Sequence, residues 1–385
     1  MRTIISGGTI LTPERTLMGH TLVIDGERIF DLSEQPVPSR PGDLLIRIPG
    51  WTIVPGFIDV HVHGAQGADA MDAAPEALLG MGKYLAQHGV TGFCPTTMAA
   101  PDDAIGVVIE AFEALGAYPG SARALGLHLE GPYLNPQYRG AQPAQYLRAA
   151  NVQEYGPWIR SGSVRLMTVA PEVEGVSDLI RAGVALGVEF AAGHSAASYE
   201  QTLAAADLGL RQSTHTFNGM PRLHHREPGL VGAILRDERI RAQIIADGIH
   251  VHPAMIRLLI QVKGTDRTVL ITDATRAAGM PDGEYLLGSE VIHVNGGVSR
   301  TEDASLAGST LSMDQALRNV MEHAELSLRD ALPMATQTPA AALGLAHRKG
   351  SIRAGYDADL VILDGANCVQ LTMVEGQVVY DAPRG

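Results

Sequence analysis

Residues 54–64 read VPGFIDVHVHG, an apolar run that ends in two histidines one residue apart. Side chains at alternate positions of a β-strand share one face, so His61 and His63 can bind one metal ion together. Such a pair at the end of a strand is typical of metal sites in barrel enzymes. By itself the pair is weak support, because this chain has 14 histidines. The interpretation therefore depends on the rest of the chain.

The composition is that of an ordinary globular protein. The chain has 385 residues, of which 45% are hydrophobic, enough for one large core and a smaller one. Its net charge of -13 and pI near 5.5 argue against nucleic acid or an anionic membrane surface as partners. With no long apolar run and no basic N-terminal leader, we expect a cytoplasmic protein. Cys94 and Cys368 are predicted to be buried thiols rather than a disulfide.

Short strands alternate with helix-length amphipathic segments after Trp51. The expected strands are residues 54–60, 90–96, 124–129, 164–169, 188–192, 211–215, 242–246 and 269–272. Helices are expected at 75–88, 102–115, 177–186, 199–207, 228–236 and 253–263. Eight such units in series predict an α/β fold, a (β/α)8 TIM-type barrel with its active site at the C-terminal ends of the strands. A doubly wound sheet is the alternative fold.

The two chain ends predict a small second domain. Residues 1–50 and 350–383 read as short strands with turns, and Asp25-Gly26 and Glu375-Gly376 are hairpin signals. Neither end could close a core alone, so we expect both ends to pair into one β-sandwich. The predicted division is 1–50 and 346–385 for the sandwich and 51–345 for the barrel. A β-like insert at 284–300 follows the last barrel strand.

Residues with metal-ligand or acid–base chemistry recur where the expected strands end. They are His61 and His63 after the first strand, His128 and Glu130 after the third, His194 after the fifth, His215 after the sixth, His250 after the seventh and Asp273 after the eighth. Any single histidine could be a buried ring bonded to backbone, and we favour that for His128 and for the His224-His225 pair. For the set, a functional constellation is the better interpretation.

Nitrogen and carboxylate ligands without cysteine suit Zn²⁺ or another divalent ion such as Fe, Co or Mn. Glu130, His194 and His215 would form one site with an open position for water. His61 and His63 would make room for a second ion, with Glu130 bridging the two. Such an ion lowers the pKa of bound water and polarises a carbonyl, which is the chemistry that amide hydrolysis needs.

Asp273 is then the predicted general base, which later returns its proton to the leaving amine. Alone, it could equally cap a turn. The whole pattern resembles the amidohydrolase superfamily, whose members combine a barrel with a β-sandwich built from both chain ends. The segment GSIRAGYDADLVILD at 350–364 is similar to the superfamily's usual return into that sandwich. Many members bridge two metals with a modified lysine after strand 4, where this chain has Ala170-Pro171-Glu172, and Glu130 replaces that lysine.

Several further blocks resemble the N-acetylglucosamine-6-phosphate deacetylase family in particular. They are HLEGPYL at 128–134, AGHS at 192–195, THTFNGM at 214–220, REPGL at 226–230, ADGIH at 246–250, TDAT at 272–275 and LAGS at 306–309. The resemblance implies metal-dependent hydrolysis of the N-acetyl group of a phosphorylated amino sugar, with Asp273 as acid/base. It also implies that the sugar phosphate or the acetyl group is held by Asn218, Gly219, Arg226, His250, Ala141, Leu306, Ala307 and Gly308.

Arg226 is a good phosphate ligand in an acidic protein, although an arginine at this place could also form a surface ion pair with Glu227. In the family the corresponding arginine reaches across a dimer interface, so the resemblance implies a homodimer. Some members carry a histidine near position 142, where this chain has Gln142. His250 could orient either the substrate carbonyl or a phosphate.

Three alternatives remain open at this point. The first is a deacetylase of the galactosamine epimer or of another N-acyl amino sugar phosphate, because one inverted hydroxyl leaves the metal motifs unchanged. The second is a catalytically silent scaffold, which should have lost ligands or the base. The third is a phosphate-blind amidase of the dihydropyrimidinase type, which the missing bridging lysine disfavours.

Overall fold

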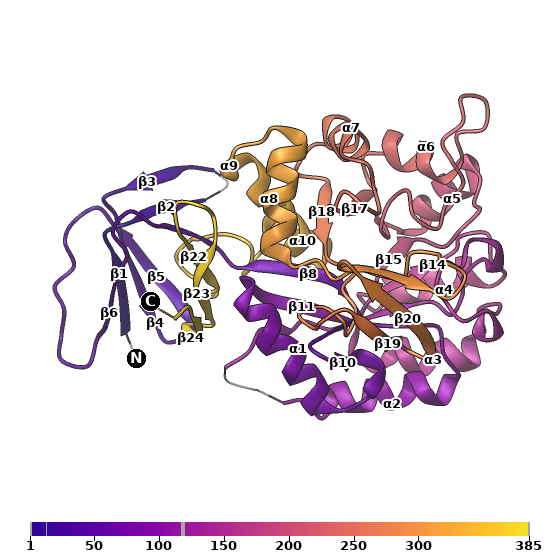
Figure 1. Cartoon of the computed structure of the whole chain (residues 1–385), viewed down its shortest axis with the longest axis horizontal. Helices are drawn as coiled ribbons and strands as arrows, with labels where there is room; N and C mark the ends of the chain where they lie inside the picture. The colour runs from indigo at the N-terminus through magenta and orange to yellow at the C-terminus, as the bar shows by residue number, and fades with distance from the viewer. Residues whose placement is uncertain (1, 13, 117–119, 384–385) are drawn as a thin grey trace.

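The computed structural model describes residues 2–12, 14–116 and 120–383. A parallel barrel with helices around it lies beside a separate β-sandwich (Figure 1). The barrel strands, in order, are β8 (Phe57–Val62), β11 (Val90–Thr97), β13 (Leu127–Glu130), β14 (Val164–Val169), β15 (Glu189–Ala192), β16 (Gln212–Ser213), β17 (Arg241–Ile245) and β18 (Thr268–Ile271). The short β12 (Arg123–Ala124) pairs with β11. The predicted (β/α)8 barrel with a small β-sandwich is confirmed.

The barrel closes through residues at the ends of its first and last strands. The Asp273 N–H donates to the His61 carbonyl at 2.9 Å, and the His63 N–H donates to the Ala274 carbonyl at 2.8 Å. Two residues before His61 in the same strand, the buried Asp59 accepts a hydrogen bond from the Thr272 hydroxyl at 2.5 Å. This closure brings the histidines of the first strand beside the aspartate that follows the last.

Helices cover the outside of the barrel (Figure 1). They are α1 (Pro75–Gln87), α2 (Asp102–Glu113), α3 (Val152–Arg160), α4 (Val176–Val184), α5 (Tyr199–Leu208), α6 (Gly229–Arg236), α7 (Pro253–Lys263), α8 (Met313–Ala324), α9 (Leu328–Ala331) and α10 (Gln337–Ala342). Helix α5 begins with a capping box between Ser198 and Gln201 and ends at Gly209, which has the left-handed backbone that a C-terminal glycine adopts readily. The sequence pattern does not predict α3, which contains Gly156 and Pro157, or the three α-helices after residue 312.

The β-sandwich is built from both ends of the chain. One sheet has the order β5 (Arg28–Ser33), β4 (Thr21–Asp25), β1 (Arg2–Ser6) and β6 (Leu44–Arg47). The other has the order β24 (Gln377–Asp381), β23 (Val369–Val374), β22 (Leu360–Leu363), β7 (Thr52–Pro55), β2 (Thr9–Leu11) and β3 (Thr16–Met18). The two predicted hairpin turns meet, since a Cβ on Gly376 would lie 2.0 Å from the Gly26 carbonyl oxygen. Only glycine fits that approach.

The expected strand 54–60 is in fact two strands that serve different domains. Its first part lies in β7, which pairs with β22 of the sandwich, and its second part lies in β8 of the barrel. The chain changes sheets at Gly56, where a Cβ would lie 2.2 Å from the Thr91 hydroxyl oxygen. A continuous apolar run hides such a break, because burial in either sheet produces the same pattern.

The predicted β insert is present as β19 (Gly283–Leu287), β20 (Glu290–Asn295) and β21 (Val298–Thr301). Its Leu287 and Ile292 pack with Met98 and Ala307 in a small apolar cluster of their own. Because Met98 follows β11, this cluster holds the insert against the C-terminal ends of the barrel strands.

Shorter elements complete the described chain. They are the β-strands β9 (Gly64–Ala65) and β10 (Ala68–Asp69) and the 3-10 helices η1 (Ala70–Asp72), η2 (Pro136–Tyr138), η3 (Ala144–Tyr146) and η4 (Leu332–Ala335). Both cysteines are free, as expected, and Cys94 is buried. The expectation of burial is wrong for Cys368, which is exposed because it lies in the turn between β22 and β23. Within the described ranges, every helix is too short or too polar to cross a membrane.

Candidate active site

The predicted ligands and base lie at or just beyond the C-terminal ends of their strands. They are His61 and His63 at β8, Glu130 at β13, His194 after β15, His215 after β16 and Asp273 after β18. Three of these residues have positive φ, 49° at His194, 28° at His215 and 50° at Asp273. Non-glycine residues rarely adopt this backbone, and such strain collects at functional sites. The strand ends thus turn sharply where the side chains enter the barrel mouth.

Six side chains form two groups of metal-ligand type. The strand-1 group consists of His61, His63 and Asp273, and the Glu130 group consists of Glu130, His194 and His215. In the strand-1 group the two Nε2 atoms lie 3.2 Å apart, and Asp273 Oδ1 lies 3.3 and 3.2 Å from them. In the Glu130 group all three such distances are 3.1 Å. Ligand atoms about 2.0 Å from a tetrahedral ion lie about 3.3 Å from one another, so each group fits one face of such a site.

Glu130 stands between the two groups. Its Oε1 faces the Nε2 atoms of His194 and His215, at 3.1 Å each. Its Oε2 lies 3.3 Å from His63 Nε2 and 3.7 Å from His61 Nε2. One carboxylate thus presents one oxygen to each group, which is the geometry that a bridging ligand requires.

Backbone carbonyls set the tautomers of two of the histidines. His63 Nδ1 donates to the Thr96 carbonyl at 3.1 Å, and His194 Nδ1 donates to the Tyr138 carbonyl at 2.9 Å. A carbonyl can only accept, so in the neutral ring the Nε2 lone pair points into the site. Both rings are therefore prepared to bind a cation through Nε2.

The electrostatics of the site favour ionised carboxylates. Burial raises the pKa of Glu130, but the surrounding histidines hold the pKa of this carboxyl well below its usual range. Burial also raises the pKa of Asp273, but His61 and His63 lower it to about 2. Both oxygen ligands are thus charged at neutral pH. Burial lowers the pKa of His63, but hydrogen bonds with the two carboxylates raise it well above its usual value.

His128 is not a member of either group. Its ring is fully buried and is bonded to threonine hydroxyls, at 2.7 Å to Thr168 and 3.3 Å to Thr96. Burial holds the pKa of His128 well below its usual value, so the ring is neutral. The expectation of a buried, hydrogen-bonded ring is right for His128, with hydroxyls in place of backbone. It is wrong for His224 and His225, which are exposed on a loop.

A cavity of about 310 Å³ opens over the two groups. Its walls include these predicted residues: His63, Glu130, Ala141, His194, His215, Asn218, Gly219, His250, Asp273, Leu306 and Gly308. They also include five residues that were not predicted as site residues from the sequence: Met98, Gly140, Gln142, Leu287 and Ser305. Met98 and Leu287 carry no chemical signal in the sequence, because apolar wall residues look like core.

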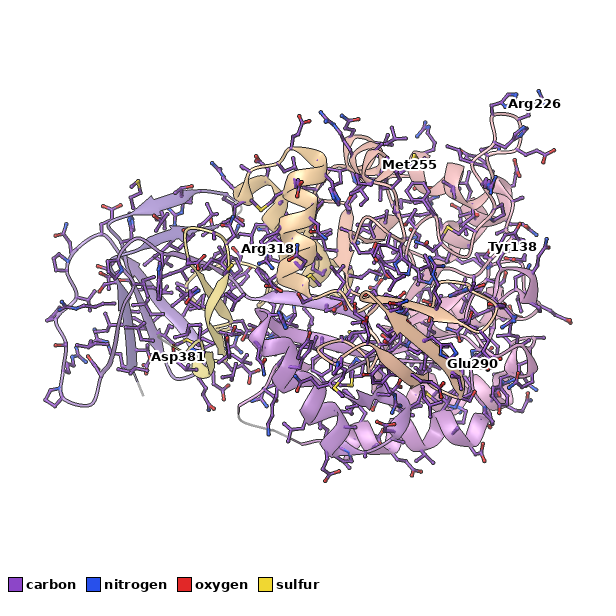
Figure 2. The ribbon with its side chains drawn as sticks, viewed as in Figure 1. Tyr138, Arg226, Met255, Glu290, Arg318 and Asp381 are labelled. Atoms are coloured by element: carbon purple, nitrogen blue, oxygen red, sulfur yellow. The ribbon has the colours of Figure 1, made fainter. Side chains whose placement is uncertain are left out.

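Three predicted residues lie outside the cavity lining. His61 is fully buried behind it, and Ala307 is buried in the apolar cluster of the β insert. Arg226 is exposed on the loop before α6, and Figure 2 shows it at the tip of a projection that points away from the rest of the chain. Its Nη1 lies 2.9 Å from Nε2 of the neighbouring His225. The walls of the cavity contain no lysine or arginine among the described residues.

His250 reaches the cavity with its ring held by Asp247. Nδ1 donates to Asp247 Oδ2 at 2.6 Å, and Asp247 Oδ1 also accepts the backbone N–H groups of Ile249 and His250 at 2.8 Å. Burial lowers the pKa of His250, but the Asp247 carboxylate raises it above its usual value. Asp247 belongs to the block ADGIH, but its residue type alone does not indicate the bond to His250.

Glu172 follows β14 and faces the neighbouring loops rather than the two metal-ligand groups. It accepts the Ser195 hydroxyl at 2.7 Å, the Ala196 N–H at 2.6 Å and the Asn135 amide at 2.9 Å. These bonds hold the loop that begins at His194, which is where the ligand ring must be kept in place.

A sequence model of the amidohydrolase family matches residues 52–379. The chain belongs to this family, as its barrel and its paired histidine and carboxylate groups already indicate. Over 362 residues it is 41% identical to the N-acetylglucosamine-6-phosphate deacetylase of Vibrio furnissii, covering 93% of this chain and 87% of the relative. It is also 40% identical over 382 residues to the N-acetylgalactosamine-6-phosphate deacetylase of Escherichia coli O157:H7, covering 98% of this chain and 99% of the relative.

A solved structure of the same kind of enzyme superimposes on nearly the whole chain. It is a mutant N-acetyl-D-glucosamine-6-phosphate deacetylase from Mycobacterium smegmatis in complex with N-acetyl-D-glucosamine-6-phosphate. The TM-score is 0.91 at 33% identity, over 98% of this chain and 99% of that chain. The resemblance stated from the sequence is therefore confirmed.

Proposed function

We propose that this protein hydrolyses the N-acetyl group of N-acetyl-D-glucosamine 6-phosphate, giving D-glucosamine 6-phosphate and acetate. The observation that carries the proposal is the pair of adjacent metal-ligand groups at the cavity, with Glu130 of one group also facing the histidines of the other. The named activities of the Vibrio furnissii and Mycobacterium smegmatis proteins support the substrate class.

The residues present fit a divalent ion, and we propose Zn²⁺, with Fe, Co or Mn as the other candidates. Glu130, His194 and His215 would hold it, and His61 and His63 would hold a second ion where two are bound. A bound ion supplies Lewis acidity, which polarises an amide carbonyl and makes water more acidic. The tautomers of His63 and His194, each set by a backbone carbonyl, leave Nε2 free for this purpose.

Asp273 is the proposed general base and acid. Its low pKa keeps it able to accept a proton from the attacking water, and it can then deliver that proton to the departing amine. Asp273 lines the cavity and the residue is only 6% exposed, so bulk water competes little for the proton.

Substrate recognition is proposed to involve Asn218, Gly219 and His250 together with the Ala141 and 306–308 segments. The described walls of the cavity lack lysine and arginine, although the proposed substrate carries a phosphate. We therefore propose that the protein is a homodimer and that Arg226 of one subunit reaches the phosphate in the cavity of the other. The exposed, projecting position of Arg226 supports this assignment.

A second candidate is the galactosamine epimer, N-acetylgalactosamine 6-phosphate. It is favoured by the 40% identity to the Escherichia coli O157:H7 enzyme, which extends over 98% of this chain. The two epimers differ at one hydroxyl, so the metal groups and Asp273 would act on both in the same way.

The test is acetate release by chelator-stripped protein with Zn²⁺, Fe²⁺ or Co²⁺ restored in turn. The substrates are the two epimeric N-acetylated sugar phosphates and unphosphorylated N-acetylglucosamine. We expect metal-dependent turnover of a phosphorylated sugar and little or none of the unphosphorylated one. Absence of turnover of either sugar phosphate, with metal content verified by elemental analysis, would contradict the proposal.

A further inference from the structure

Gln142 makes two buried hydrogen bonds at the edge of the Glu130 group. The residue lies in the loop between η2 and η3 and has an exposed fraction of 2%. Its Oε1 accepts the backbone N–H of Ala99 at 2.7 Å, and its Nε2 donates to Glu130 Oε2 at 2.6 Å. Since a backbone N–H can only donate, Ala99 determines which end of the carboxamide faces Glu130. The amino end is therefore aimed at the carboxylate.

The hydrogen bond from Gln142 restricts the rotation of the Glu130 carboxylate about its terminal torsion. Histidines contact both of its oxygens, Oε1 from His194 and His215 and Oε2 from His63. The terminal torsion of a glutamate side chain is broad, so the carboxylate needs an external contact to settle in one orientation. At 2.6 Å, the bond from Gln142 is shorter than the contacts of Oε2 with the two histidines, and it holds Oε2 on the strand-1 side.

We propose that Gln142 is a positioning residue for the metal site, which presets Glu130 so that Oε1 faces His194 and His215. The inference rests on the proposed metal dependence but not on the identity of the sugar. A carboxamide suits this place because it carries an acceptor for Ala99 and a donor for Glu130 on one planar group. A glutamate of the same shape would instead bring a second carboxylate against Glu130.

Metal affinity measured without substrate tests this role. We would titrate stripped wild-type protein and the variants Gln142→Met and Gln142→Glu with Zn²⁺ in competition with a chromophoric chelator. Loss of an outer partner of a metal ligand costs about 10- to 100-fold in affinity, and we expect a loss of that size in Gln142→Met. The expected loss in Gln142→Glu is similar. The matched control is Gln137→Met, an exposed glutamine just before the same loop, which should bind Zn²⁺ like the wild type.

A second readout reports the geometry of the ion directly. The visible spectrum of the Co²⁺ protein depends on how the ligands are arranged, so it should change in Gln142→Met and remain unchanged in Gln137→Met. Unfolding curves of the stripped proteins establish that the variants are folded. If Gln142→Met does not fold, Gln142→Glu provides the same comparison, because one oxygen of the new carboxylate can still accept the Ala99 N–H.

The outcomes separate this inference from the proposed function. Wild-type affinity and an unchanged Co²⁺ spectrum in folded Gln142 variants, with a raised KM for the sugar phosphate, would make Gln142 a substrate contact and overturn the inference alone. Wild-type affinity with an unchanged KM would also overturn it. Failure of the wild-type protein to bind any of the divalent ions would overturn the inference and the proposed metal-dependent function together.

Discussion

Replacement of Arg226 by alanine is the sharpest test of how the phosphate is recognised. Hydrogen bonds between charged groups contribute about 1.5–3 kcal/mol each. At 1.4 kcal/mol for each factor of ten, the loss of one such bond lowers kcat/KM for the phosphorylated sugar by about 10- to 150-fold. The change should come mainly from KM, because the proposed role of Arg226 is to bind the phosphate, which does not react. An Arg181→Ala variant, which removes another exposed arginine, should behave like the wild type.

Mixing of subunits decides which chain supplies the arginine. Subunits of Arg226→Ala are exchanged at equal amounts with subunits of Asp273→Asn and assayed with the phosphorylated sugar well below the wild-type KM, where each variant alone has a small fraction of wild-type activity. If Arg226 acts across a dimer, every mixed dimer has one site with both residues intact. Random pairing makes half of the dimers mixed, so the mixture should reach about one quarter of wild-type activity. The reasoning is refuted if the mixture, verified to contain mixed dimers, is no more active than its two components.

Three further predictions follow from the site and its surroundings. Asp273→Asn should lower kcat by about 10²- to 10⁴-fold and leave Zn²⁺ bound, as elemental analysis and acetate release would report. Asp247→Asn removes the charge that raises the pKa of His250. The stability that a charged His250 adds to the wild type is fully present below about pH 6.5 and is lost as the pH rises through the raised pKa of the folded protein. The difference in free energy of unfolding between wild type and variant, measured with urea, should therefore become smaller as the pH rises. Lys349→Met removes the ammonium partner of the buried Asp359, while Asp357 keeps its pairs with Arg28 and Arg348, and should cost about 3–5 kcal/mol in urea unfolding. Removal of the exposed Arg181 charge should cost less than about 1 kcal/mol.

The barrel could be predicted because its signals are local. Short β-branched runs that alternate with amphipathic helical segments require nothing beyond neighbouring residues to be recognised. The boundaries of the strands were predicted less accurately, as the run at 54–60 shows. Both halves of that run are buried and apolar, and only the pairing of β7 with β22 and of β8 with β11 shows that the chain leaves one sheet for another.

The grouping of the candidate ligands could be predicted from their types and their places at strand ends, because parallel strands of a barrel bring their C-terminal ends together. The residues that form hydrogen bonds with these site residues could not be predicted. Gln142 and Asp247 are a glutamine and an aspartate among many, and their bonds to Glu130 and His250 depend on the exact course of two loops. The apolar walls at Met98 and Leu287 were equally invisible, since the sequence does not distinguish a cavity wall from a core.

The sequence by itself determined the fold class, the pairing of the two chain ends and the chemical identity of the site. These depend on periodicity, turn residues and residue type, all of which are written along the chain. Only the tertiary structure decided that Glu130 presents one oxygen to each histidine pair and that Arg226 projects on a loop outside the cavity lining of its own chain. Orientation and distance between residues far apart in sequence follow from how the loops pack, and that packing is a property of the folded chain as a whole.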